Sequence, residues 1–165
     1  MLNSATNTLR ERGKFKLEIH NALYENEDLR DLILGDTSGM KQSQIIKSFK
    51  DHVKSHLFVD DTITETGTFV YYDVVFPYLK EHIKTSQIIV YAICHRDILE
   101  DYYNDKYVGN RADILAEIIE DVLLNSDVVN NFGIGNLTLD NVNIYNAARF
   151  YGTIMTFSVP NFRCA

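Results

Sequence analysis

The spacing of apolar residues predicts helices in the first third of the chain. Between about residues 14 and 25 the apolar side chains recur every three or four positions, as on one face of a helix. A short apolar helix is expected from Asp28, and Gly35 should end it. Residues 41 to 57 repeat the helical spacing and predict a second long helix. The polar residues 1 to 12 are expected to form a flexible N-terminal arm.

Two segments in the middle of the chain have the composition of strands. Residues 68 to 76 are rich in β-branched and aromatic residues, and Pro77 should end this strand or mark a sheet edge. Residues 86 to 94 are apolar at both odd and even positions. A strand with two apolar faces is expected in the centre of a sheet that is covered on both sides.

The stretch GNRADILAEIIEDVLLNS, residues 109 to 126, predicts the best-defined helix. Asn110 is a favourable N-cap, and Asp113 stands three residues later, where the two can bond as in a capping box. One side of the helix is an apolar stripe and the other is acidic. The stripe consists of Leu115, Ile118, Ile119 and Val122, and the acidic side consists of Glu117, Glu120 and Asp121. Such a helix is expected to lie across a sheet.

Two further strands, at about residues 137 to 145 and 149 to 159, are expected to follow. The second does not keep a strict alternation, and Gly152 is the expected position of a bulge. The order of elements predicts an α+β fold with N-terminal helices and a mostly antiparallel sheet of four or slightly more strands, with one helix packed on one face. A chain of 165 residues favours a single domain, here residues 13 to 165.

The net charge of −7 argues against a protein that binds nucleic acid tightly. Phosphate binding requires clustered Lys and Arg residues, and the nearest approach is the segment RERGKFK at residues 10 to 16. The two cysteines, Cys94 in an apolar run and Cys164, do not make a disulfide framework, so a reducing compartment is expected. The apolar runs are far shorter than the roughly 20 residues that span a bilayer, and no membrane partner is expected.

Two groups of residues have types that occur in active sites, but neither has the rest of a known motif. His52 and His56 stand four apart on a predicted helix and could reach one metal ion, yet Val53 occupies the position where a metalloprotease has Glu. The HRD sequence at residues 95 to 97 lacks the Asn of a kinase catalytic loop, because residue 102 is Tyr. A polar cluster at a strand end is the better interpretation of HRD.

Cysteine chemistry is also disfavoured. Cys94 and its neighbour His95 should point to opposite faces of a strand and so cannot pair. The GIG segment at residues 133 to 135 does not open a helix after a strand, so it predicts a flexible turn and not a dinucleotide site. The sequence therefore predicts no catalytic residue, no cofactor and no metal site, and a protein that is not an enzyme.

Four consecutive segments of the second half form a pattern. The strand SQIIVYAICHRD leads through a loop to the helix NRADILAEIIEDVLLN, and the segments LTLDNVNIY and ARFYGTIMTFSV follow. This order resembles the tail-terminator, or tail-completion, proteins of long-tailed bacteriophages. In that family an N-terminal helix precedes a β-hairpin, a helix led by arginine or aspartate packs on the sheet, and a pair of strands closes the domain. The resemblance covers roughly residues 65 to 160.

The resemblance implies a structural role in the virion neck. Proteins of this family form rings, usually hexameric, that stop growth of the tail tube at its head-proximal end and join it to the head connector. For this chain it implies a homo-oligomeric ring made in the host cytoplasm, with a tail-tube protein and a connector or stopper protein as partners. DNA would pass through the hole without sequence-specific binding.

Within such a ring, the helix at residues 109 to 126 would brace the sheet, so that loops and strand edges contact the next subunit head to tail. Tyr102, Tyr103, Tyr107 and Arg149 are the predicted subunit or partner contacts.

Two other functions stay open. The first is a head-closure or connector adaptor protein of the same neck, because the segment 28 to 57 is additional to the family pattern. The second is a small cytosolic enzyme or ligand-binding domain, with a pocket at His95, Arg96 and Asp97 or a metal site at His52 and His56.

Overall fold

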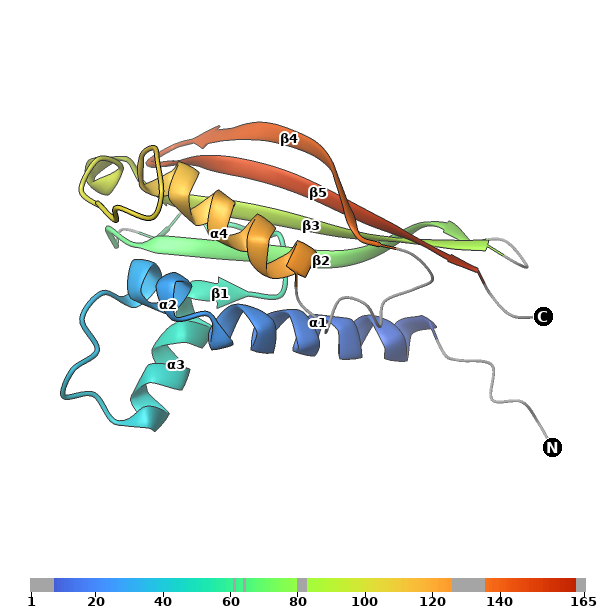
Figure 1. Ribbon diagram of the computed structural model, residues 1–165, viewed down its shortest axis with the longest axis horizontal. Coiled ribbons are helices and arrows are strands. Elements are labelled where there is room, and N and C mark those ends of the chain that lie inside the picture. The colour runs from blue at the N-terminus through green and yellow to red at the C-terminus, as the bar shows by residue number, and fades with distance from the viewer. Residues whose placement is uncertain (1–7, 61, 64, 80–82, 126–135, 163–165) are drawn as a thin grey trace.

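The computed structural model describes residues 8–60, 62–63, 65–79, 83–125 and 136–162. Within these residues it confirms the α+β class, with helices against a mostly antiparallel sheet whose strand order is β1-β2-β3-β5-β4 (Figure 1). The helices are α1 (Thr8–Glu25), α2 (Glu27–Leu34), α3 (Gln42–His52), η1 (Arg96–Ile98, a 3-10 turn) and α4 (Arg111–Asn125). The strands are β1 (Val53–Lys54), β2 (Thr68–Leu79), β3 (Ile83–His95), β4 (Thr138–Ala147) and β5 (Phe150–Phe162).

The helices form a layer on one face of the sheet (Figure 1). α4 contacts β3 and β5, whereas α1 and α2 contact β2 and α4. The core between the two layers contains buried side chains from α1, α2, α3 and α4 and from the strands: Ile19, Leu29, Phe49, Leu115, Val70, Val90 and Phe157. The apolar spacing that predicted these helices therefore reflects one shared core.

The helix α4 has the cap that the sequence predicts. Asp113 N donates to Asn110 Oδ1 at 3.0 Å, and Asn110 N donates to Asp113 Oδ2 at 3.1 Å. This reciprocal pair of bonds satisfies the backbone N–H groups of Asn110 and Asp113 at the start of the helix. The apolar stripe is buried as predicted, except that Val122 is half-buried and Leu123 is fully buried in its place.

The strand β3 is central, as predicted, but its two faces are not covered equally. Val90 and Ala92 are buried against the helices. On the opposite face, side chains of the loop between β1 and β2 pack over one end of the sheet, where Ile93 is fully buried. Ile89, further along the same face, is only half-buried. The predicted cover on both sides therefore applies to one end of the strand.

The second long helix ends at His52 and not at residue 57, so this part of the prediction is wrong. Val53 is extended, with φ −120° and ψ 107°, and pairs in parallel with Val70 as part of β1. A β-branched residue packs well on a pleated surface, and Val53 is buried there. Leu57 then packs with Phe69 on the sheet face opposite the helices. Helical spacing alone cannot exclude this change of structure.

The helix α1 begins at Thr8, earlier than predicted. Residues 8 to 12 of the predicted arm are therefore helical, and residues 1 to 7 lie outside the described part of the chain. The predicted stop of α2 is confirmed, because Gly35 caps it with a positive φ of 69° and its N donates to Asp31 O at 2.8 Å.

Two basic residues of α1 bind one carboxylate on β2. Arg12 Nη2 lies 2.7 Å and Lys16 Nζ lies 2.8 Å from Asp73 Oδ1. Arg12 Nε also donates to the carbonyl oxygen of Val74 at 2.7 Å. Burial raises the pKa of Asp73, but the hydrogen bonds that it accepts outweigh burial and hold this pKa below its ordinary value. These contacts fix the start of α1 against the sheet.

We expect Asp73→Asn to lower the free energy of unfolding by about 1 kcal/mol at neutral pH, a figure reduced for the partial exposure of the two ion pairs. Because the folded-state pKa of Asp73 is depressed, its carboxylate stabilises the fold above the unfolded-state pKa, and this contribution is lost as the pH falls through the folded-state pKa. The difference from wild type should therefore shrink below about pH 4. Urea unfolding at neutral and acid pH measures it, and an unchanged difference would contradict the prediction.

Pro77 lies inside β2 and does not end it. The strand continues to Leu79 past a register shift between Val75 and Tyr78. The second predicted alternative, a sheet edge, is confirmed, because β1 pairs with β2 only at Val70 and Tyr71. Proline has no N–H to donate, and an irregular point at a sheet edge tolerates this loss. The predicted strand therefore extends further than residue 76, and the other predicted strands are present with slightly longer bounds.

Gly152 does not lie at a bulge, and that prediction is wrong. The pairing of β5 is regular through Gly152, with Ile93 on one side and Tyr145 on the other. The irregularity of the β4–β5 hairpin lies in β4, after Leu139. Glycine is required for another reason, since a Cβ atom at Gly152 would lie 1.9 Å from the carbonyl oxygen of Ala92. Strand β5 thus approaches β3 too closely for any side chain at this position.

Candidate functional site

The loop between β3 and α4 carries the tyrosines predicted as subunit contacts, and two of them face inward. Tyr107 Oη donates to Asp28 Oδ2 at 2.7 Å, and Tyr102 Oη lies 3.5 Å from Asp31 Oδ2. Both hydroxyls are therefore held against α2. Tyr103, in contrast, is 87% exposed. The predicted set divides into two tyrosines that position the loop and one that the loop presents to solvent.

The bond between Tyr107 and Asp28 is insensitive to physiological pH. Burial and the neighbouring Asp28 carboxylate raise the pKa of Tyr107 to about 12, so its hydroxyl stays protonated and remains a donor. Lys106 Nζ lies 3.4 Å from the same carboxylate and balances its charge. The Tyr107 hydroxyl is therefore available as a hydrogen-bond donor throughout the physiological pH range.

Arg111 connects this loop to two other elements, α2 and β2. Its Nε donates to Thr68 Oγ1 at 2.6 Å, and its Nη2 donates to the carbonyl oxygen of Leu32 at 2.7 Å. Its backbone N donates to Leu99 O at 2.8 Å, and its guanidinium lies 5.4 Å from the centre of the Tyr102 ring. One residue at the start of α4 thus holds the end of α2, the start of β2 and the loop. The sequence marks it only as the first residue of a helix.

The end of β3 and the β4–β5 turn form a second exposed surface. Arg96 Nη2 donates to Ala148 O at 2.6 Å, and Arg96 N donates to Arg149 O at 2.8 Å. His95 is buried, and its Nδ1 accepts a bond from Asp97 N at 3.2 Å, which caps η1. A cavity of about 420 Å³ opens here, lined by Thr66, His95, Arg96, Asp97 and Arg149. The structure therefore brings the HRD segment and Arg149 together, although they are far apart in the sequence.

The side chains around this cavity are engaged in holding the chain. The His95 ring packs edge-on against Phe150, with ring centres 5.7 Å apart. Arg96 is bonded to the turn, while Arg149 is exposed. HRD thus forms a polar cluster at a strand end, as the sequence favoured. The cluster presents two arginines, Arg96 and Arg149, and the carboxylate of Asp97 to solvent.

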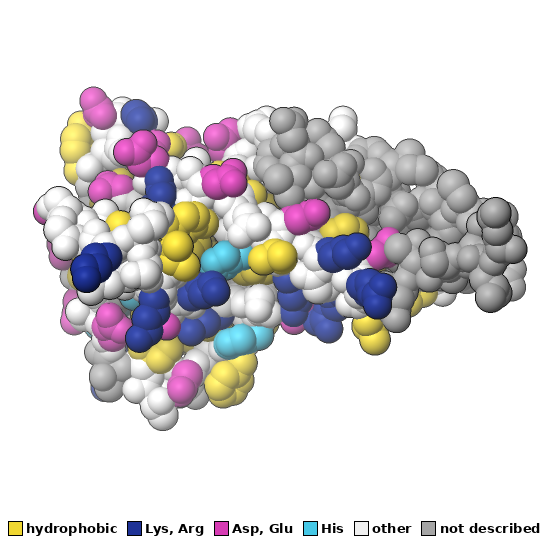
Figure 2. Space-filling view, turned by 90° about the horizontal axis from the view of Figure 1, so that it is seen from below, with side chains coloured by type: hydrophobic (Ala, Val, Ile, Leu, Met, Phe, Trp, Pro, Cys, Tyr) yellow, Lys and Arg dark blue, Asp and Glu magenta, His cyan; other side chains and the backbone are white. Residues whose placement is uncertain are grey.

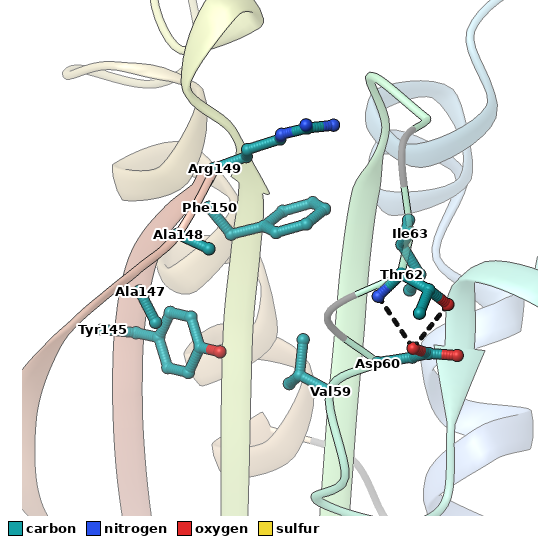
Figure 3. A pocket seen from close by; sticks show the side chains of 9 residues that line it. All are labelled: Val59, Asp60, Thr62, Ile63, Tyr145, Ala147, Ala148, Arg149 and Phe150. Carbon is teal, nitrogen blue, oxygen red and sulfur yellow. Dashed lines mark hydrogen bonds between the residues drawn. The ribbon is translucent and has the colours of Figure 1, made fainter.

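A smaller cavity of about 300 Å³ lies on the sheet face opposite the helices (Figure 3). Tyr145 and Phe150 of the β4–β5 hairpin face the apolar side chains of the loop between β1 and β2 across it, and Arg149 extends past Phe150 at one end. The carboxylate of Asp60 is already bonded, since its Oδ1 accepts from Thr62 N at 2.8 Å and Thr62 Oγ1 at 2.6 Å. Arg149 lines both this cavity and the larger one at the end of β3.

The helix that was expected to carry the candidate pair His52 and His56 ends between the two residues. His52 is the last residue of α3, and His56 lies beyond β1. His52 Nδ1 lies 2.8 Å from Ser48 O, and its ring stacks on Phe69 at 5.0 Å. His56 instead faces Tyr71, with ring centres 5.8 Å apart. In the part of the chain that the structure describes, no group of three or more His, Cys, Asp or Glu residues is placed to hold a metal ion.

Cys94 has the environment of a structural thiol. It is fully buried, and burial raises its pKa to about 11, so the nucleophilic thiolate is disfavoured. The neighbouring His95 packs instead on Phe150. Cys164 and the GIG segment at residues 133 to 135 lie outside the described residues.

Basic side chains gather on the underside of the helical layer (Figure 2). Exposed examples on α1 and α3 are Arg10, Lys14, Lys47 and Lys50. Arg10 and Lys14 lie in the basic segment RERGKFK, whereas Lys47 and Lys50 come from a second helix that is separated from it in the chain. The net charge of −7 is therefore unevenly distributed over the surface.

None of the described helices combines the length and the apolar character that a membrane crossing requires.

The geometry defines an α+β protein in which a loop and a strand end are held at the surface by hydrogen bonds. The chain matches the model of the YomW family over residues 17–159, and it belongs to this family. The family is phage-derived, of the SPbeta-prophage type, so the chain is a phage-associated protein. A comparison with curated proteins gave no match.

Proposed function

We propose that the protein is a structural component of the phage head–tail neck, without catalytic activity. In this role it forms a homo-oligomeric ring, six-membered by resemblance, which ends the tail tube and joins it to the head connector. DNA passes through the hole without sequence-specific contacts. The tail-tube protein and a connector or stopper protein are the proposed neighbours in the virion.

The order of elements around α4 is the observation that carries this proposal. The β2–β3 hairpin, the helix α4 on the sheet and the β4–β5 hairpin follow one another as in tail-terminator proteins. The phage origin of the family supports the same conclusion. The matched region also contains α2 and α3, so the segment that is additional to the tail-terminator pattern is part of the YomW family.

Two exposed surfaces are the proposed contacts with the next subunit. Tyr103 is 87% and Val108 is 88% exposed on the loop that Arg111 holds in place. The exposed Arg149 lies at the β4–β5 turn, at the same end of the sheet (Figure 1). Tyrosine and arginine are enriched in protein interfaces because they combine a large contact area with hydrogen-bonding groups. A head-to-tail ring uses two different patches on each subunit. The loop with Tyr103 and the turn with Arg149 are the two proposed patches.

Native mass spectrometry and negative-stain microscopy of the purified protein, with and without tail-tube protein, test the ring. We expect closed rings of six. The double variant Tyr103→Ala, Arg149→Ala should weaken ring formation by about tenfold or more, as for loss of an interface anchor. Phe58→Ala, at a side chain that is 73% exposed in the loop between β1 and β2, is the matched control and should leave the rings unchanged. A monomer that does not assemble even on tail-tube protein would refute the proposal.

Deleting the gene from the phage separates the terminator from the adaptor alternative. Loss of a terminator removes the stop on tube growth, so tails of excessive and variable length are expected. Loss of an adaptor would leave tails of normal length that fail to join DNA-filled heads. The first result supports the proposed role, and the second assigns the protein to head closure.

A further inference from the structure

The strand β4 is an open edge of the sheet. It pairs with β5 along one side from Thr138 to Ala147, and no other described strand lies on its second side. A long open edge presents unpaired backbone N–H and C=O groups to other chains, and proteins usually protect it with lysines, prolines or covering elements. β4 contains no Lys, Arg or Pro, and Asp140 is its one charged residue. The bulge beside Asp140 is its only irregularity in the pairing.

The exposed side chains of β4 are apolar at two alternate positions. Val142 is 58% and Ile144 is 70% exposed, and both belong to the face of the strand that the helices cover elsewhere in the sheet. The carboxylate of Asp140 is bonded locally, because Thr138 Oγ1 and Ser158 Oγ both donate to it. The middle of the edge is therefore neutral and partly apolar.

The opposite edge of the sheet is protected. β1 pairs with β2 at Val70 and Tyr71. Beyond this pairing, the carbonyl oxygen of Val74 accepts a bond from Arg12 Nε at 2.7 Å, and Val74 N donates to Asp73 Oδ1 at 2.8 Å. Side chains thus occupy the N–H and C=O groups of Val74, which another strand at this point of the edge would need. Among the described strands, β4 is the edge that can accept a partner, and a second copy of the chain offers only the same edge.

We propose that two copies of the protein pair through β4, antiparallel and about a two-fold axis at Asn143. In this register Val142 of each copy lies opposite Ile144 of the other. The two-fold axis repeats this pair, so both exposed apolar residues of each copy are in contact with the partner. Asn141 lies opposite Tyr145, and Asp140 lies opposite Asn146. No like charges meet, although the whole chain carries −7.

This contact differs in symmetry from the contact of a ring. A two-fold contact uses the same patch on both subunits, whereas a head-to-tail ring uses two different patches. The β4 pairing therefore goes beyond the proposed function and can hold or fail independently of it. In a ring-forming protein it would join two rings or hold two free subunits together.

Sedimentation velocity over a concentration series tests the pairing. We expect a dimer whose association weakens by at least tenfold in Ile144→Lys, because the substitution places a charge at the centre of the contact. Leu17→Lys makes the same change at a side chain that is 61% exposed on α1, and it should leave the dimer unchanged. Equal association in the wild type and Ile144→Lys overturns the proposal.

Disulfide cross-linking tests the register, also when larger assemblies form. In a Cys164→Ser background, Asn143→Cys places two thiols opposite each other, about 4.5 to 5.5 Å apart at Cβ, from which a small adjustment allows a disulfide. Asn141→Cys is the matched control, since its two copies would lie roughly 13 Å apart along the strands. Rapid oxidation of Asn143→Cys alone supports the two-fold axis. No cross-link in either variant, or equal cross-linking in both, overturns it.

Discussion

Gly152→Ala is expected to destabilise the protein by about 3 kcal/mol, at the upper end of the cost of overpacking. The added Cβ would lie 1.9 Å from Ala92 O and 2.7 Å from Ile93 Cα. Both are backbone atoms of the central strand, so no side chain can rotate away to relieve the clash. Strands β3 and β5 would have to separate, and this costs hydrogen bonds and core packing together.

Urea unfolding followed by far-ultraviolet circular dichroism measures this effect. Gly13→Ala is the matched control, because Gly13 is exposed on α1 and a Cβ there meets no atom within 4 Å. In a helix, alanine is favoured over glycine by up to about 1 kcal/mol, so this control should stabilise the protein slightly. The same substitution thus has opposite signs at the two sites. Equal unfolding midpoints for both variants would show that β5 can move away from β3 at little cost.

Arg111→Ala is expected to lower the free energy of unfolding by about 3 kcal/mol, through two lost charge-assisted bonds. The side chain of Thr68 and the carbonyl of Leu32 would lose their donor, and both residues are almost fully buried. An unsatisfied buried acceptor costs more than the bond itself contributes. The ring of Tyr102 would also lose the cation above it.

The loop between β3 and α4 gives a second measurement. If Arg111 holds this loop, Arg111→Ala should increase its proteolysis and hydrogen exchange, and ring formation through Tyr103 should weaken as well. Arg111→Lys keeps the charge but cannot reach two acceptors with a planar fork, so it should recover only part of the stability. Arg149→Ala, at an exposed arginine, should leave stability within about 0.5 kcal/mol of wild type. Similar losses for the Arg111 and Arg149 variants would contradict this role of Arg111.

The features that the sequence predicted well depend on residues close together in the chain. The cap of α4 needs only Asn110 and Asp113, and the stop of α2 needs only Gly35. The central position of β3 follows from its own apolar faces. The end of α3 was misplaced because Val53 joins the sheet by pairing with Val70, and helical spacing contains no information about that partner. For the same reason, the close approach that requires Gly152 was mistaken for a bulge.

The candidate site was less predictable, since its residues meet across the fold. Tyr102 and Tyr107 looked like free surface residues until the structure placed the acids of α2 beside their hydroxyls. Arg149 and HRD gave separate hypotheses in the sequence and share one cavity in the structure. The pair of His52 and His56 depended on a helix that ends before His56.

The strand order also determines when the fold can form. Among the described strands β5 is the last to be synthesised, yet it lies between β3 and β4 and alone connects them. Until the ribosome has made β5, β3 exposes an unpaired apolar edge and β4 has no neighbour. The sheet therefore cannot be completed before β5 is made, and chains interrupted before residue 150 would be prone to aggregate. A chain that lacks β5 cannot contribute a folded subunit, so it would not be available for assembly.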